Sequence, residues 1–149
     1  MSLMQNISAQ TTGVQFILNN YLKIKDALVK SNVKLTQTSS NELIISINKV
    51  AITDLKQKEK TEFEKQKENL IKLAKKIAST DNIEKQRTAF AELSITTWKL
   101  IKDAESVNQS VYYEYCPMKK SYWLSTEKEI KNPYYGSSMI TCGNVSDKK

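Results

Sequence analysis

The chain has 149 residues, of which 40% are hydrophobic and 26% are charged, so its length and composition fit one globular domain. It contains no histidine, which excludes Ser-His-Asp and Cys-His catalytic pairs as well as histidine-ligated zinc sites. Its three glycines form no phosphate-binding loop, and no pair of carboxylates is marked out for catalysis. We therefore predict that the protein is not an enzyme.

The net charge of +7 comes almost entirely from lysine, because Arg87 is the only arginine. Lysines alternate with glutamates in residues 56–60 and 65–68, a pattern typical of a solvated helix face, so we expect no nucleic-acid partner. No run of about 18 apolar residues is present, so we expect no transmembrane segment. The first residues lack a basic patch followed by an apolar stretch, so we also expect no signal peptide.

Residues 1–12 are polar and are expected to lead into the first helix. From Gly13 to Val29 apolar residues recur at steps of three and four, which predicts a helix ending near Ser31 and Asn32. The following segment, residues 34–55, is more ambiguous.

Within this segment, residues 36–41 are polar and could form a loop, and residues 43–47 are rich in β-branched residues and could form a strand. The helical period continues to Leu55, however, and favours a second helix.

A third helix is predicted over residues 58–79. The expected buried stripe of this helix is Phe63, Gln66, Leu70, Leu73, Ala74 and Ile77. Asp81, three residues before Glu84, predicts the start of a fourth helix by reciprocal capping, and this helix should run to about Ser106. Its expected inward residues are Ile83, Phe90, Leu93, Thr97, Trp98, Ile101 and Ala104. Its expected solvent-facing residues are Glu84, Lys85 and Arg87.

Four helices joined by short polar loops pack most easily as antiparallel neighbours. We therefore predict an all-α fold, an up-down four-helix bundle with a C-terminal irregular lobe that contains short extended segments. The whole chain, residues 1–149, is expected to form a single domain. Residues 13–106 would make the helical bundle, and residues 107–145 would make a terminal lobe rich in Cys, Met and Tyr.

Inside the lobe, residues 111–115 and 121–124 are β-branched or aromatic and predict two short strands, arranged as a small hairpin. Residues 125–129 could make one helical turn, and residues 145–149 are expected to be disordered. The tyrosines of the lobe could form a recognition patch. The favoured interpretation is that they pack the lobe onto the bundle, with Tyr122 and Trp123 as the anchor.

Four sulfur side chains in the lobe are the candidate site: Cys116, Met118, Met139 and Cys142. Thiolate and thioether sulfurs are soft donors that prefer Cu(I) or Ag(I) to hard cations. Two thiolates with one such ion leave a single negative charge, which Lys119 and Lys120 could balance. Metal transfer would proceed by ligand exchange, so we expect the site to lie near the surface.

Two other interpretations of the cysteines remain open. Cys116 and Cys142 could form a disulfide that pins the terminal lobe. Alternatively, both could be reduced and buried as small hydrophobic residues, with the two methionines in the core of the lobe beside the tyrosines.

Six stretches of the chain carry a resemblance: residues 115–118 (YCPM), 122–125 (YWLS), 129–136 (EIKNPYYG) and 139–143 (MITCG) in the lobe, and residues 21–28 (YLKIKDAL) and 81–87 (DNIEKQR) in the helices. Together they resemble a bacterial family called domain of unknown function 3347. Many relatives have a longer, glycine-rich insertion where this chain has only residues 119–121.

The resemblance implies an extracytoplasmic protein, periplasmic or extracellular and lipid-anchored in some precursors. It also implies a role in heavy-metal handling, because the domain is attached to periplasmic adaptors of copper and silver efflux pumps. We therefore expect a Cu(I)- or Ag(I)-binding protein whose partners are the metal ion and an efflux adaptor. The alternative is a non-catalytic interaction or structural module pinned by a Cys116–Cys142 disulfide.

Overall fold

The computed structural model describes residues 13–149, and the expectation for residues 1–12 lies outside this range. Four helices come first: α2 (Gly13–Val29), α3 (Val33–Asn48), α4 (Gln57–Ala78) and α5 (Ile83–Ile101), with a 3-10 turn η1 (Ile52–Asp54) between α3 and α4. The strands β1 (Tyr112–Cys116), β2 (Ser121–Ser125) and β3 (Asn144–Lys148) follow, with a second 3-10 turn, η2 (Gly136–Ser138), before β3.

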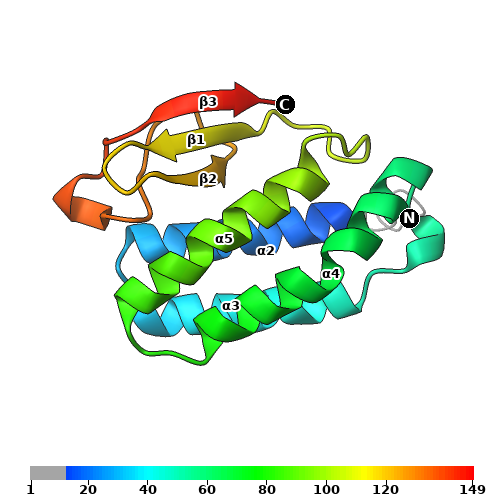
Figure 1. The fold of residues 1–149 in the computed structure, drawn as a ribbon, viewed down its shortest axis with the longest axis horizontal. Helices are drawn as coiled ribbons and strands as arrows, with labels where there is room; N and C mark the ends of the chain where they lie inside the picture. Colours follow the sequence, from blue (N-terminus) through cyan, green and yellow to red (C-terminus); the bar gives the residue numbers. More distant parts are fainter. Residues whose placement is uncertain (1–12) are drawn as a thin grey trace, which may run out of the picture.

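The helices and the sheet are stacked in layers (Figure 1). Each helix packs against the next one along the chain, and the sheet lies over α2 and α5, which it contacts mainly through β2. The four predicted helices are confirmed, but the all-α class is wrong because the lobe contains a three-stranded antiparallel sheet of order β2-β1-β3. The up-down arrangement of the bundle stays a prediction.

The second predicted helix is confirmed, and the strand and loop alternatives inside it are wrong. Residues 36–41 are helical although they are polar, and their buried hydroxyls find partners within the helix: Thr36 donates to the Asn32 carbonyl at 2.7 Å and Ser40 donates to the Thr36 carbonyl at 2.7 Å. The helix ends at Asn48 and not at Leu55. Beyond its end, the side chain of Val50 packs directly over Gly13, where a Cβ atom would lie only 2.8 Å from it.

The fourth helix begins and ends elsewhere than the sequence indicates. Its capping residue is Asn82, whose side chain accepts from the Lys85 N–H at 3.0 Å, and not Asp81. The helix ends at Ile101, five residues before Ser106. The chain turns there because the Glu59 carboxylate accepts a hydrogen bond from the Ser106 backbone N–H at 2.8 Å.

The predicted hairpin is confirmed, since β1 and β2 pair in antiparallel register with Glu114 opposite Trp123. The prediction that residues 145–149 are disordered is wrong, because β3 pairs with the other side of β1 and Lys149 exchanges two backbone hydrogen bonds with Val111. Residues 126–129 form a bend and not a helical turn. The strand β3 is exposed on both faces and polar, so it has no hydrophobic alternation that would predict a strand.

Tyr21 links the helices to the sheet. Its ring stacks on Phe90 of α5 with centroids 5.0 Å apart, and its hydroxyl lies 2.6 Å from the Ser94 hydroxyl. The same hydroxyl accepts the Leu124 backbone N–H of β2 at 2.9 Å. Because this hydroxyl is completely buried, its partners replace the water it has lost.

Arg87 is only 9% exposed, so its predicted solvent-facing position is wrong. Its guanidinium donates to the carbonyls of Pro133 at 2.8 Å and Leu28 at 3.1 Å, and to the Ser31 hydroxyl at 3.1 Å. It also contacts the Glu84 carboxylate at 3.3 Å. The planar fork of donors suits this arrangement, in which one side chain joins the end of α2, the start of α5 and the lobe.

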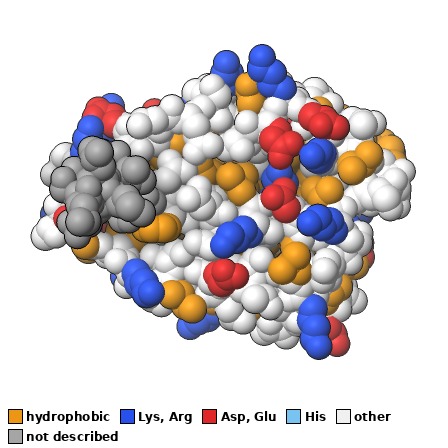
Figure 2. Space-filling model, turned by 180° about the vertical axis from the view of Figure 1, so that it is seen from behind, with side chains coloured by type: hydrophobic (Ala, Val, Ile, Leu, Met, Phe, Trp, Pro, Cys, Tyr) orange, Lys and Arg blue, Asp and Glu red, His pale blue; other side chains and the backbone are white. Residues whose placement is uncertain are grey.

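Within residues 13–149, none of the helices is both long enough and apolar enough to cross a membrane. The face behind the view of Figure 1 carries lysines and acidic side chains side by side, with small apolar patches between them (Figure 2).

Replacing Arg87 with alanine should lower the free energy of unfolding by roughly 2–4 kcal/mol, because buried carbonyls lose their donors. Urea unfolding followed by circular dichroism measures this change. The matched control is Lys85→Ala, which removes an exposed cation from the same helix turn and should change stability by less than about 0.5 kcal/mol. Equal effects of the two substitutions would contradict a structural role for Arg87.

Candidate functional site

The hairpin loop places the first two sulfurs. Cys116 and Ser121 are the last pair of the β1–β2 ladder, and residues 117–120 turn the chain between them. Lys120 closes this turn in the left-handed region, at φ 50°. The Cys116 side chain points inward and is completely buried, whereas Met118 at the tip of the loop is 64% exposed.

Asn132 holds the segment that carries the other two sulfurs. This residue is fully buried, and its side chain donates to the Cys142 carbonyl at 2.7 Å and accepts the Tyr134 N–H at 2.7 Å. Its backbone N–H donates to the Ile140 carbonyl at 2.7 Å. One asparagine therefore fixes residues 140–142 against the chain that follows β2.

Gly143 allows this segment to approach the sheet. It has a φ of 147°, and a Cβ atom there would lie 2.7 Å from the Trp123 ring and 3.1 Å from the Tyr115 carbonyl. A side chain could be accommodated only if the indole moved. The close contact brings Cys142 beside the end of β1.

The two cysteines, which are far apart in the sequence, meet in the structure. The Cys142 side chain lies within hydrogen-bonding reach of the Cys116 side chain, and both are free thiols. Burial raises the pKa of the Cys142 thiol and the adjacent Cys116 raises it further, whereas a hydrogen bond from the Met118 backbone lowers it. The thiol form is therefore favoured until a metal ion or a base removes the proton.

The two methionines border this thiol pair through their backbones. Met118 contacts the Cys142 thiol through its main chain, and Met139 accepts the Cys142 N–H at 3.1 Å. Both side chains are directed to the surface, since Met118 is 64% and Met139 is 39% exposed. All four predicted residues thus belong to one end of the lobe, with one sulfur buried and the others increasingly accessible. Among residues 13–149, no group of three or more His, Cys, Asp or Glu side chains could hold a metal ion.

Lys119 connects the hairpin loop to the rest of the fold. It is 3.7 Å from the Glu84 carboxylate at the start of α5, and its ammonium lies 5.2 Å from the centre of the Tyr135 ring. These contacts hold the hairpin loop against α5 and against the segment that leads to η2.

Glu114 is a buried carboxylate that the sequence analysis missed. It lies on the same face of β1 as Cys116, opposite Trp123, and neither of its oxygens nor the Trp123 indole nitrogen has a hydrogen-bond partner of normal geometry. Burial raises the pKa of Glu114 to about 7, although the buried Lys25 ammonium lowers it. The sequence contained one signal for this position. Side chains alternate between the two faces of a strand, so residue 114 is expected on the same face as Cys116.

The tyrosines on the other face of the hairpin form a row of rings. Trp98 of α5 stacks on Tyr113 at 4.7 Å, Tyr113 stacks on Tyr122 at 4.6 Å, and Tyr122 meets Tyr115 at 4.7 Å. Trp123 on the opposite face is completely buried, and the Tyr134 hydroxyl donates to the Tyr122 carbonyl. The aromatic residues therefore pack the hairpin against α5 and also leave a half-exposed face.

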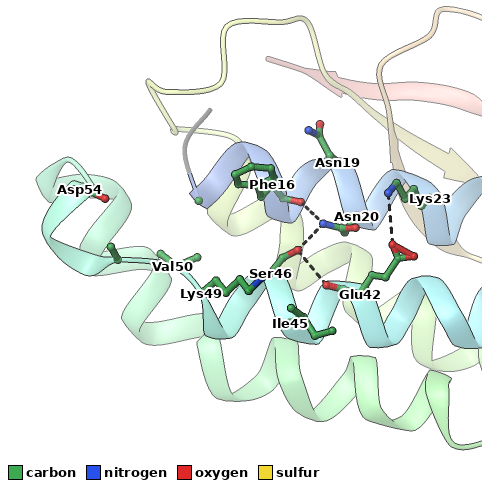
Figure 3. A pocket seen from close by; sticks show the side chains of 12 residues that line it. Phe16, Asn19, Asn20, Lys23, Glu42, Ile45, Ser46, Lys49, Val50 and Asp54 are labelled. Carbon is green, nitrogen blue, oxygen red and sulfur yellow. Dashed lines mark hydrogen bonds and ion pairs between the residues drawn. The ribbon is translucent and has the colours of Figure 1, made fainter. Parts of the chain in front are cut away.

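A groove of about 880 Å³ lies between α2 and α3, away from the sulfurs (Figure 3). Phe16 and Ile45 supply apolar surface to it. An ion pair of 3.6 Å between Lys23 and Glu42 and a hydrogen bond from Asn20 to Ser46 connect its two walls. The described residues that line it include none of the four predicted sulfur residues, so this groove and the predicted site are separate features.

A family model described as "Protein of unknown function (DUF3347)" matches residues 17–109, which is more than half of the chain. The match covers the helices and stops before β1, so the four sulfurs lie outside it. No curated protein and no solved structure matches the chain.

Glu114 should make stability depend on pH. Its folded pKa of about 7 lies above the ordinary value of 4.5, so the folded state binds the proton more tightly than the unfolded state. The free energy of unfolding should therefore be highest below about pH 4.5 and fall by roughly 3 kcal/mol as pH rises to 7. Urea unfolding at several pH values measures this slope.

In the Glu114→Gln variant, this fall in the free energy of unfolding between pH 4.5 and 7 should be nearly absent. The control is Glu129→Gln, which removes an exposed carboxylate from the segment after β2 and should leave the slope unchanged. A wild-type protein whose stability rises steadily from pH 4.5 to 7 would contradict a raised pKa for Glu114.

Proposed function

The chain belongs to the DUF3347 family of proteins of unknown function, and we propose that it binds a soft monovalent metal ion, Cu(I) or Ag(I), at its four sulfurs. The observation that supports the proposal most directly is the contact between the thiols of Cys116 and Cys142. These residues are brought together by two independent devices, the β1–β2 hairpin and the Asn132 clamp.

The chemistry of the donors favours soft ions over hard ones. Two thiolates and a monovalent ion form a unit with one negative charge, and thioether sulfurs can occupy further positions around Cu(I) or Ag(I). Lys119 and Lys120 in the hairpin loop balance the remaining charge. A divalent hard ion would need several oxygen ligands, and residues 13–149 contain no group of three or more His, Cys, Asp or Glu side chains that could hold a metal ion.

The sulfurs differ in their exposure, and the proposed route of the ion runs from the most exposed one to the buried one. Met118 is the most exposed, Cys142 is half-buried and Cys116 is fully buried. An ion captured by a surface thioether would move inward by ligand exchange and be held by the thiols, where water is excluded. Binding displaces thiol protons, so affinity should increase as pH rises.

The cellular setting that we propose follows from the family resemblance. The protein would act outside the cytoplasm, in the periplasm or at the cell surface, and would buffer the ion or pass it to an efflux adaptor. Reduced thiols there would need to be protected from oxidation, and a bound soft ion provides such protection because it occupies the thiolate lone pairs.

The double variant Cys116→Ser, Cys142→Ser should lose saturable binding of Cu(I), measured by competition with a coloured chelator under reducing, oxygen-free conditions. The matched control is Met118→Leu, Met139→Leu, which keeps side-chain size and should weaken affinity by only about tenfold, or about 1.4 kcal/mol, because the thiolates remain. Unchanged chelator competition in the cysteine variant would contradict the proposed ligands.

A structural module is the second candidate, and the same thiol contact favours it. Oxidation of Cys116 and Cys142 would join β1 to the segment before β3 and pin the lobe. Protein purified without reductant would then have a mass lower by two hydrogen atoms and would lose about 3 to 4 kcal/mol of stability on reduction. If the reduced protein binds neither Cu(I) nor Ag(I) and the oxidised protein is more stable, the structural role holds in place of the metal site.

A further inference from the structure

Three connections meet at the end of the molecule that carries the sulfurs. These are the turn from α2 to α3, the turn from α4 to α5 and the β1–β2 hairpin loop (Figure 1). Arg87 bridges the first two and the lobe, and Lys119 in the hairpin loop contacts Glu84 in the first turn of α5. The contacts therefore place these loops around one surface.

This surface is strongly basic. The exposed lysines on it, called the lysine end below, are Lys30, Lys34, Lys85, Lys119 and Lys120. Only two carboxylates, Asp81 and Glu84, occur in the same connections, and Glu84 is already shared between Arg87 and Lys119. The surface therefore has an excess of positive charge.

The opposite end of the helices lacks this excess. Its connections, residues 48–60 and 102–110, contain five lysines and four carboxylates. One of these lysines, Lys56, lies 3.0 Å from the Glu105 carboxylate. The positive excess is thus concentrated at the end where the soft donors lie, although lysines occur along the whole chain.

The most accessible sulfur belongs to the same end. Met118 immediately precedes Lys119 and Lys120 in the hairpin loop, and its thioether is exposed to solvent. A partner that approached this loop would therefore meet both positive charge and an exposed thioether. Such complementarity raises association rates and selects for negatively charged partners.

We infer that the lysine end docks an acidic protein that delivers or collects the soft metal ion. This inference rests on the proposed metal-binding function. Docking would bring the partner's metal to Met118 and from there to Cys116 and Cys142. In the transfer, two Cu–S(thioether) bonds to the donor break and two Cu–S(thiolate) bonds form. The two thiol protons pass to buffer, and Cu(I) stays Cu(I).

The probe is a synthetic peptide that carries a methionine pair flanked by glutamates and is loaded with Cu(I). Transfer of the ion to the reduced protein is followed by stopped-flow fluorescence. The charge-reversal variant Lys30→Glu, Lys34→Glu, Lys85→Glu should slow transfer at least about tenfold at low salt, and the difference should shrink when salt is raised.

Two matched controls isolate the location and the sign of the charge. The variant Lys58→Glu, Lys65→Glu, Lys102→Glu has the same net charge but changes exposed lysines away from the site, and it should transfer at nearly the wild-type rate. A peptide with glutamines in place of the glutamates should transfer at one rate to all three proteins. Equal slowing in both charge-reversal variants would overturn the inference.

Equilibrium binding separates this inference from the metal site itself. Both charge-reversal variants should keep wild-type affinity for Cu(I) in chelator competition. A wild-type protein that binds no Cu(I) in the same assay would reject the proposed function. Vesicles of phosphatidylglycerol test a membrane surface as the anionic partner. Binding to vesicles that needs Lys30, Lys34 and Lys85, with no effect of these residues on peptide transfer, would overturn the acidic-protein partner.

Discussion

The guanidinium of Arg87 determines how the lobe sits on the helices. It donates to the Leu28 carbonyl at the end of α2 and to the Pro133 carbonyl in the lobe. Gly136 packs against the same point, because a Cβ atom there would lie 2.8 Å from the Val29 carbonyl. Pro133 follows Asn132, the residue that clamps the Cys142 segment, so Arg87 anchors this side of the candidate site to the helices.

The lobe combines two different ways of burying polar groups. Asn132 has partners for both its side-chain amide and its backbone N–H, which makes it a rigid clamp. Glu114 and Trp123 lie nearby with no hydrogen-bond partner of normal geometry, at a cost in stability. The lobe therefore combines one fully hydrogen-bonded buried amide with one buried carboxylate that lacks such partners, and burial raises the pKa of that carboxylate.

The helices could be predicted from the sequence because their apolar spacing reports one buried face. Phe63, Leu70 and Leu73 are buried as that spacing indicates. The hairpin could also be predicted, since β-branched and aromatic residues flank a short turn. The strand β3 could not, because both its faces are exposed and its stability comes from backbone pairing with β1. The sequence placed Arg87 wrongly on the solvent face because the helical pattern predicts that charged residues point outward. The carbonyls that bind its guanidinium belong to distant segments, and a pattern within one helix does not show them.

The sequence indicated the residue types of the candidate site and a position near the surface, but not which of the two cysteines is buried. Nothing in the spacing of Cys116 and Cys142 distinguishes a buried thiol from a half-buried one, since this depends on how residues 140–143 cross the sheet. That crossing has an optical consequence. Because Gly143 packs directly against the Trp123 ring while Trp98 stacks on Tyr113, the two tryptophans have different surroundings. The indole emission of Trp123 would report on events at the neighbouring cysteine without any added label.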